Sequence, residues 1–265
     1  MLKGPSSSMY GVSVPGGIVN VVSKRPKGTP FNEVRLTLGT DQRQELAFDF
    51  TRPVGVGRLS YRLTGVLRDA GTPLEGYSDD LAMIAPRLTY QLTDRTRITV
   101  LGEYSSSTRG GTASYYNPSD GVASNTYIGD TAYNDFVNDQ WRVGYEIEHE
   151  LTATITLRQK MRYSEVDADP QFSGIYAAGT GFGRYRGHYL ENSENLMIDT
   201  TLEAGFATGG MDHRLVAGFD YGKSSCDAYY GGVGYVSAAA VQPYSGGQDM
   251  DQKGIYLHDQ ILVGR

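Results

Sequence analysis

Apolar and polar residues alternate with a period of two along most of this chain. Between residues 33 and 68, three consecutive stretches place an apolar side chain at every second position. This is the spacing of a β-strand with one apolar face, not the 3.6-residue spacing of a helix. The alternation returns in residues 81–92, 96–104, 141–148, 155–163, 196–204, 214–221 and 253–263. The sequence therefore predicts an all-β protein with about ten antiparallel strands.

Two of these stretches contain a residue that interrupts the pattern. Pro86 lies in the middle of 81–92, and because proline cannot donate a ladder hydrogen bond it predicts an edge strand or a bulge there. Asp259 falls among the apolar positions of the last stretch. Residues 81–92 and 253–263 are therefore the least regular of the predicted strands.

The connections between the predicted strands alternate in length. Those near 52–57, 93–96, 150–153 and 206–212 are short, whereas those near 69–80, 106–139, 165–188 and 223–252 are long. An up-and-down outer-membrane β-barrel has such a pattern, with tight periplasmic turns and long external loops. The fold class predicted is thus a transmembrane β-barrel, of which this chain supplies a part.

Charges of both signs occupy the polar face of the central strands. They could face bulk water in a one-sided sheet or the wet lumen of a barrel, and the loop pattern favours the lumen. The residues concerned are Arg142, Glu146, Glu148, Arg158, Lys160, Arg162, Asp199 and Glu203.

Composition narrows the class further. No apolar run approaches the roughly 20 residues of a membrane helix, and the mean hydropathy of −0.38 is compatible with strands that alternate between lipid and water. The single cysteine, Cys226, excludes an internal disulfide, and the net charge of −6 argues against a nucleic-acid partner. Residues 1–20 lack the pattern of a signal peptide, so we expect a fragment of a longer outer-membrane protein.

Tyrosine is concentrated in the predicted long loops. Its large amphipathic ring suits ligand capture at low entropy cost, although packing of the loops on themselves would use the same residues. The predicted loop at 106–139 contains four aspartates and one arginine. This excess of negative charge would repel a polyanion, so it favours a neutral or mixed-charge ligand. The candidate ligand-binding residues are Tyr115, Tyr116, Tyr127, Tyr133, Tyr176, Tyr185, Tyr229 and Tyr230.

Enzyme classes find no support in the sequence. It contains no GxSxG, HExxH, Walker A or CxxC motif, and its four histidines have no neighbours at metal-ligand spacing. We therefore predict no catalytic residues, no metal site and no cofactor.

The first stretch of the chain carries the most specific pattern. Gly4-Pro5 and Pro15-Gly16-Gly17 set tight turns, a β-branched run follows, and Lys24-Arg25-Pro26 ends it. This run resembles the C-terminal end of the plug domain in TonB-dependent outer-membrane receptors, in particular ferric-siderophore receptors. The residues that carry the resemblance are Lys3, Gly4, Pro5, Tyr10, Gly11, Gly16, Gly17, Asn20, Arg25 and Pro26.

The resemblance implies two domains and a transport function. Residues 1–28 would be the end of the plug, and residues 29–265 the N-terminal portion of the barrel. It also implies a ferric siderophore as ligand, TonB as partner through a region N-terminal to this stretch, and outer-membrane lipid around the barrel. Lys3 stands where relatives commonly carry arginine, and lysine cannot pair bidentately with a barrel carboxylate.

Two other functions fit the same sequence. A TonB-dependent receptor for another cargo, such as cobalamin or a glycan, would share the plug-end pattern, although the Lys-Arg-Pro ending favours siderophores. A surface β protein with a binding role only would share the strand pattern.

Overall fold

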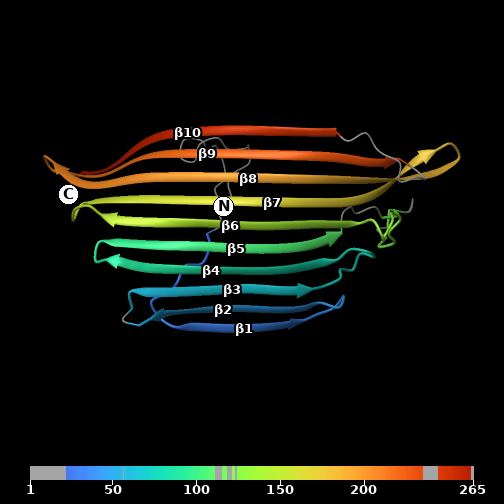
Figure 1. Cartoon of the computed structure of the whole chain (residues 1–265), viewed down its shortest axis with the longest axis horizontal. Coiled ribbons are helices and arrows are strands. Elements are labelled where there is room, and N and C mark those ends of the chain that lie inside the picture. Colours follow the sequence, from blue (N-terminus) through green and yellow to red (C-terminus); the bar gives the residue numbers. More distant parts are fainter. Residues whose placement is uncertain are drawn as a thin grey trace.

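The computed structural model describes residues 22–55, 57–110, 115–117, 121–122, 124–234 and 244–263. Ten strands form one antiparallel sheet in which each strand pairs with the next along the chain (Figure 1). The predicted all-β architecture and strand number are confirmed. The strands are β1 (Phe31–Leu38), β2 (Gln44–Val54), β3 (Leu59–Asp69), β4 (Asp79–Thr93), β5 (Thr96–Gly110), β6 (Asp135–Glu150), β7 (Ile155–Ala178), β8 (Gly181–Thr208), β9 (Met211–Gly234) and β10 (Tyr244–Val263).

The two edges of the sheet are β1 and β10, which do not pair with each other. Within the described residues, no helix is long and apolar enough to cross a membrane.

One end of the sheet carries only short connections, at 55–58, 94–95, 151–154 and 209–210. These are the four short connections that the sequence predicts, and we call this end the turn end; it lies on the left in Figure 1. Gly209 adopts the positive φ of 59° that a two-residue hairpin turn requires. The opposite end, the loop end, carries the segments 70–78 and 111–134.

The prediction of long loops at 165–188 and 223–252 was wrong. β7 and β8 continue as paired strands up to a two-residue turn at 179–180, where Gly179 has a φ of 58°. The reason is that aromatic residues and glycines alternate in this region with the same period of two, so the backbone groups are satisfied in a ladder. β9 likewise pairs with β8 as far as Gly234.

These extended strands are much longer than a membrane requires. β7 has 24 residues and β8 has 28, whereas a membrane-spanning strand needs roughly 9–11. The β7–β8 hairpin therefore projects beyond its neighbours at the loop end, on the right in Figure 1. The projection and the rest of the sheet are continuous, because the same ten-stranded sheet contains both.

The two faces of the sheet differ in what they present. The side chains of Leu36, Leu38 and Leu257 are 69%, 72% and 72% exposed and share one face, which we call the outer face. The eight charged residues predicted to line a lumen lie on the other face, the inner face, because register is continuous across β6–β9.

Pro86 neither ends β4 nor forms a bulge. It lies in a central strand opposite Leu63 of β3, and the register with β5 is the same on both sides of it. Gly102 is the residue across from it on β5, and a Cβ there would lie 3.4 Å from the proline ring. The glycine therefore leaves room for the ring, and the irregularity in β4 occurs instead between Gln91 and Thr93.

Candidate functional site

Residues 22–28 cross the inner face of the sheet before the chain enters β1 (Figure 1). Lys24 donates a hydrogen bond from Nζ to Oδ2 of Asp49 on β2 at 2.8 Å. Arg25 reaches in the other direction, to Glu146 on β6, through Nε at 2.9 Å and Nη2 at 2.5 Å. Two adjacent residues thus attach the segment to strands that are four places apart in the sheet.

Asp49 is also the partner of a buried arginine. Arg62 on β3 donates from Nε and Nη2 to the two carboxylate oxygens at 2.8 and 2.7 Å. The side chains of Arg62 and Asp49 are only 7% and 8% exposed. Arg62 Nη1 donates to the carbonyl oxygen of Arg25 at 2.9 Å, so this pair holds the backbone of the segment as well.

A threonine completes the attachment. Thr51 Oγ1 accepts a hydrogen bond from the backbone amide of Lys27 at 3.0 Å and lies 2.8 Å from the carbonyl oxygen of Tyr61, to which it donates. Thr51 is fully buried. The segment therefore satisfies polar groups of the wall that would otherwise need water.

A second group of charges follows on β4–β6. Glu103 accepts from Arg142 at 2.6 Å and from Arg87 at 3.4 Å. The Arg87 side chain is 5% exposed, and its Nε atom has no hydrogen-bond partner among the described residues. Two arginines thus share the single carboxylate of Glu103.

The inner face is hollowed beside the segment. A groove of about 860 Å³ runs from β4 to β10, and its lining mixes charged residues with glycines. Ser23 of the segment is one of the residues that line it, together with Arg87, Glu103, Glu146 and Lys160. None of the eight tyrosines predicted to bind a ligand lines it.

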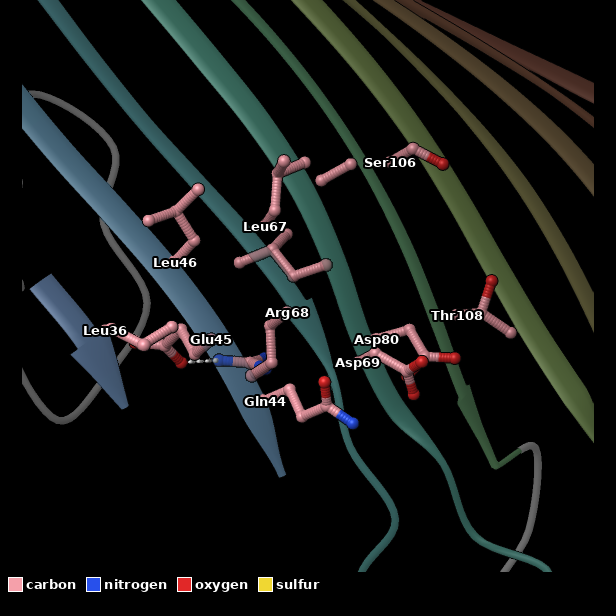
Figure 2. A pocket seen from close by; sticks show the side chains of 12 residues that line it. Leu36, Gln44, Glu45, Leu46, Leu67, Arg68, Asp69, Asp80, Ser106 and Thr108 are labelled. Carbon is pink, nitrogen blue, oxygen red and sulfur yellow. Dashed lines mark ion pairs between the residues drawn. The ribbon is translucent and has the colours of Figure 1, made fainter. Parts of the chain in front are cut away.

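Figure 2 shows a second, shallower groove of about 450 Å³ on β1–β5 near the loop end. Leu36, Leu46 and Leu67 form a row across three strands on the outer face. Gln44, Asp69, Asp80 and Thr108 lie nearer the strand ends, and Glu45 pairs with Arg68 at 3.7 Å. Because its row of leucines belongs to the apolar outer face and it contains no predicted tyrosine, we do not assign the ligand site to it.

The loop between β5 and β6 packs against the β7–β8 projection. The hydroxyl of Tyr127 lies 3.0 Å from Ser173 Oγ, which also accepts from the backbone amide of Asp130 at 2.6 Å. Asp130 forms an ion pair with Arg186 of β8. The Arg186 guanidinium holds the pKa of the Asp130 carboxyl below its ordinary value of 3.8.

Tyr133 and His188 form a further contact between the β5–β6 loop and the projection. The Tyr133 ring meets His188 edge-on at 6.5 Å between centroids, and Arg186 lies 5.2 Å above the same ring. His188 Nε2 lies 2.5 Å from Asp169 on β7. Desolvation raises the pKa of the Tyr133 hydroxyl, which stays neutral at physiological pH.

The structure separates the eight predicted tyrosines into three groups. Tyr115 and Tyr127 form an isolated β-bridge in the β5–β6 loop, with Tyr116 and Tyr133 in the same loop. Tyr176, Tyr185 and Tyr230 share the inner face of β7, β8 and β9, whereas Tyr229 lies on the outer face. The prediction that the last four lie in loops was wrong; whether any of the eight binds a ligand stays a prediction.

Sequence reasoning missed Tyr189 and the part that Phe172 plays beside it. These two rings stack at 5.4 Å between centroids, and Tyr189 contacts Tyr230 at 4.6 Å. The signal in the sequence is the alternation of aromatic residues with glycine in 172–176 and 183–189. It indicates strands, not loops, with all their rings on one face.

The plug-end residues Lys3, Gly4, Pro5, Tyr10, Gly11, Gly16, Gly17 and Asn20 lie outside the described residues. Of the predicted motif, Arg25 and Pro26 are described, and Arg25 is the residue that pairs with Glu146. Among the side chains that the structure describes, no three His, Cys, Asp or Glu residues are grouped so that they could hold a metal ion.

A meandering antiparallel sheet with an apolar outer face, a charged inner face and a peptide segment docked across it defines the wall of a plugged membrane β-barrel. The family model "TonB dependent receptor-like, beta-barrel" matches residues 87–265. The chain therefore belongs to the TonB-dependent receptor family of outer-membrane β-barrels.

Several relatives carry siderophore-receptor names. The chain is 32% identical over 265 aligned residues to the ferrichrome outer membrane transporter/phage receptor of Escherichia coli K12, covering 87% of this chain and 35% of that protein. It is 31% identical to the ferrioxamine B receptor of Salmonella typhimurium, covering 100% and 41%. The chain thus spans about two fifths or less of the length of these relatives.

Solved structures confirm the fold. The closed form of the ferric-catecholate import receptor Fiu from E. coli K12 superposes with a TM-score of 0.85 at 17% identity, covering 100% of this chain and 43% of that one. The siderophore receptor PiuA from Acinetobacter baumannii gives a TM-score of 0.80 at 20% identity, covering 98% and 44%.

Proposed function

We propose that this chain is the end of the plug, residues 1–28, and the N-terminal portion of the barrel, residues 29–265, of a receptor that takes up a ferric siderophore with energy from TonB. The observation that carries the proposal is the docking of residues 22–28 across the inner face through Lys24 and Arg25. A plug needs a segment that lies inside the barrel and is held by charges on well-separated strands of the inner face, here β2 and β6. The names of the relatives support the cargo.

The chemistry of this attachment suits a part that must later move. Lys24 is 61% exposed and Arg25 31% exposed, so both cations can exchange a carboxylate partner for water at modest cost. A plug held by an apolar core would instead expose that core whenever it moved. The buried Arg62–Asp49 pair stays within the wall as a fixed docking point.

Binding would take place at the loop end, where the projection and the β5–β6 loop meet. The scarce chelate would be held there, and TonB would then pull on a plug region N-terminal to this chain. Ion pairs between segment and wall would release one by one as the plug rearranges. The apolar outer face would remain in outer-membrane lipid throughout.

The test is iron uptake by a strain that expresses the complete receptor as its only siderophore receptor. We expect ⁵⁵Fe to accumulate from a ferric siderophore, and the accumulation to stop when the tonB gene is deleted. TonB-dependent uptake of cobalamin or a glycan without any iron uptake would refute the cargo. Ligand binding that is insensitive to TonB would refute the transport role and leave a surface-binding protein.

A further inference from the structure

Arg87 on β4 is a buried cation that the described wall neutralises poorly. Its side chain is 5% exposed, and its one ion pair among the described residues joins Nη2 to Oε2 of Glu103 at 3.4 Å. Nη1 donates to two neutral acceptors, Thr64 Oγ1 at 3.2 Å and the carbonyl oxygen of Ala85 at 3.0 Å. Nε has no hydrogen-bond partner in the described part of the chain. Burial of a charge with so little compensation is costly.

Glu103 is already engaged by a second arginine. Arg142 lies directly across the β5–β6 ladder from it and places Nη2 2.6 Å from Oε1. The Nε of Arg142 is also buried without a partner among the residues that the structure describes. One buried donor on each guanidinium is therefore unsatisfied by the described wall, and buried donors in native proteins are rarely left so.

The neighbouring carboxylates are committed to other cations. Asp49 forms its two-point pair with Arg62, and Glu146 meets both Nε and Nη2 of Arg25. Arg62 also lies directly across the β3–β4 ladder from Arg87. Like charges in directly opposite positions of a sheet repel each other, so Arg62 adds to the cost of burying Arg87.

The two arginines are accessible from the interior of the barrel. Arg87, Glu103 and Arg142 all line the groove of about 860 Å³ on the inner face. Ser23 of the docked segment lines the same groove, so this site is continuous with the surface on which residues 22–28 dock. A group carried by the plug is therefore the occupant that the position favours.

The plug end within this chain supplies no negative charge. Residues 1–28 contain no Asp or Glu, and their charged side chains are the cations Lys3, Lys24, Arg25 and Lys27. A carboxylate for Arg87 must therefore come from another part of the receptor. In the proposed architecture, the part that shares the barrel interior with residues 22–28 is the plug region N-terminal to this chain.

We infer that a carboxylate side chain of that plug region binds to Arg87 and Arg142. The inference rests on the proposed function and adds a contact whose polarity is opposite to that of Arg25 and Glu146. A carboxylate accepts two parallel hydrogen bonds from a guanidinium and supplies the missing countercharge. A water molecule would satisfy Nε but would leave the buried charge uncompensated. Two contacts of opposite polarity fix the register of the plug, because a shifted plug would bring like charges together.

The test uses the complete receptor in detergent and measures the hydrogen-exchange protection factors of its plug amides. Arg87→Gln removes the charge and keeps a hydrogen-bond donor. We expect it to lower these protection factors by at least about tenfold, because a plug carboxylate loses its buried partner. Arg97→Gln is the matched control, since Arg97 also lies on the inner face but pairs with Glu148 at 2.9 Å and is 52% exposed. It should change them by less than about threefold.

A double-mutant series identifies the partner. Each Asp and Glu of the plug is replaced by Asn or Gln, alone and together with Arg87→Gln. We expect one replacement to have no further effect in the Arg87→Gln background, because both changes remove the same contact. Shifted mobility in unheated gel samples checks that each barrel is folded. If Arg87→Gln does not assemble, Arg142→Gln replaces it in the series, since the Arg142 side chain is 32% exposed.

The outcomes separate the contact from the transport role. Unchanged plug protection in the folded arginine variant would overturn the inference. Independent, multiplying effects for every plug carboxylate would also overturn it, because the arginine would then act on the wall alone. Both results leave TonB-dependent uptake of ⁵⁵Fe by the parent receptor intact. A coupled plug carboxylate in a receptor that takes up no iron would support the contact and refute the proposed function.

Discussion

Arg25 and Glu146, which are 121 positions apart in the chain, form a two-point ion pair across the inner face of the sheet. The guanidinium meets both carboxylate oxygens, the geometry that lysine cannot reproduce. Their side chains are 31% and 29% exposed. The pair is thus neither a surface salt bridge nor a fully buried one. We therefore expect its contribution to stability to lie between those of exposed and buried ion pairs.

Breaking this pair should destabilise the complete receptor measurably. We expect Arg25→Ala and Glu146→Ala to show a coupling energy of about 1–2 kcal/mol in a double-mutant cycle, between the values for exposed and buried pairs. Thermal unfolding in detergent measures it. Arg35 and Glu33 on β1 provide the matched control, since they pair at 2.5 Å but are 67% and 41% exposed. A coupling energy for Arg35 and Glu33 as large as that for Arg25 and Glu146 would show that the position of the latter pair inside the barrel does not strengthen it.

The buried pair between Arg62 and Asp49 should matter more. Asp49→Ala would leave Arg62 buried without its carboxylate and would also remove the partner of Lys24. We expect a loss of about 3–5 kcal/mol of stability, or failure of the barrel to assemble. Lys24→Ala removes only the exposed partner and should cost under about 1 kcal/mol. Equal losses in the two variants would show that Asp49 serves the segment and not the wall.

The sequence predicts the strands because period-two alternation is a local property. The turns near 94, 152 and 209 and the common face of Arg158, Lys160 and Arg162 could be predicted for the same reason. The contact between Arg25 and Glu146 could not be predicted from the sequence. It depends on which strand lies opposite the segment in the folded sheet, and local alternation does not encode that. The motif identifies the docking segment, whereas the position of β6 in the sheet determines that Glu146 is its partner.

The candidate site shows a different limit of sequence reasoning. Tyr229 and Tyr230 are identical in residue type, yet they point to opposite faces because β9 continues through them. If the region is assigned to a loop, the alternation of side chains between the two faces of a strand no longer applies, and the two tyrosines cannot be distinguished. The pattern Phe172-x-Gly174-x-Tyr176, taken as a strand, places its rings on one face by alternation alone.

Acid should release the β5–β6 loop from the projection. Because Arg186 lowers the pKa of Asp130 in the folded state, the ion pair stabilises the docked loop above the ordinary carboxyl pKa of 3.8. That stabilisation is lost as the pH falls through the lowered pKa, so it is present at pH 7 and declines below about pH 4. The protection factors of the amides in residues 124–134, obtained from hydrogen exchange after correction for the pH dependence of intrinsic exchange, should therefore fall on acidification.

The variant Asp130→Asn should expose this loop to exchange already at pH 7 and remove most of the acid effect. Asp94→Asn is the control, because Asp94 is 95% exposed at the turn end. Unchanged protection factors in residues 124–134 between pH 7 and pH 3 in the parent protein would show that Ser173 and Tyr127 suffice to hold the loop.

Replacing Gly144 should strain the wall where the segment docks. Gly144 lies on the inner face of β6, and a Cβ there would lie 2.5 Å from the carbonyl oxygen of Met161, a backbone atom that cannot rotate away. We expect Gly144→Ala to cost about 1–3 kcal/mol of stability, as overpacking does elsewhere. Gly222 on β9 occupies an equivalent inner position but has only Gln252 at 3.8 Å, so Gly222→Ala should change stability by less than about 0.5 kcal/mol. Thermal unfolding of both variants of the complete receptor compares them directly. A neutral Gly144→Ala would mean that β6 and β7 can separate at this point, and that the close approach of the two strands beside Glu146 is not needed to hold the docked segment.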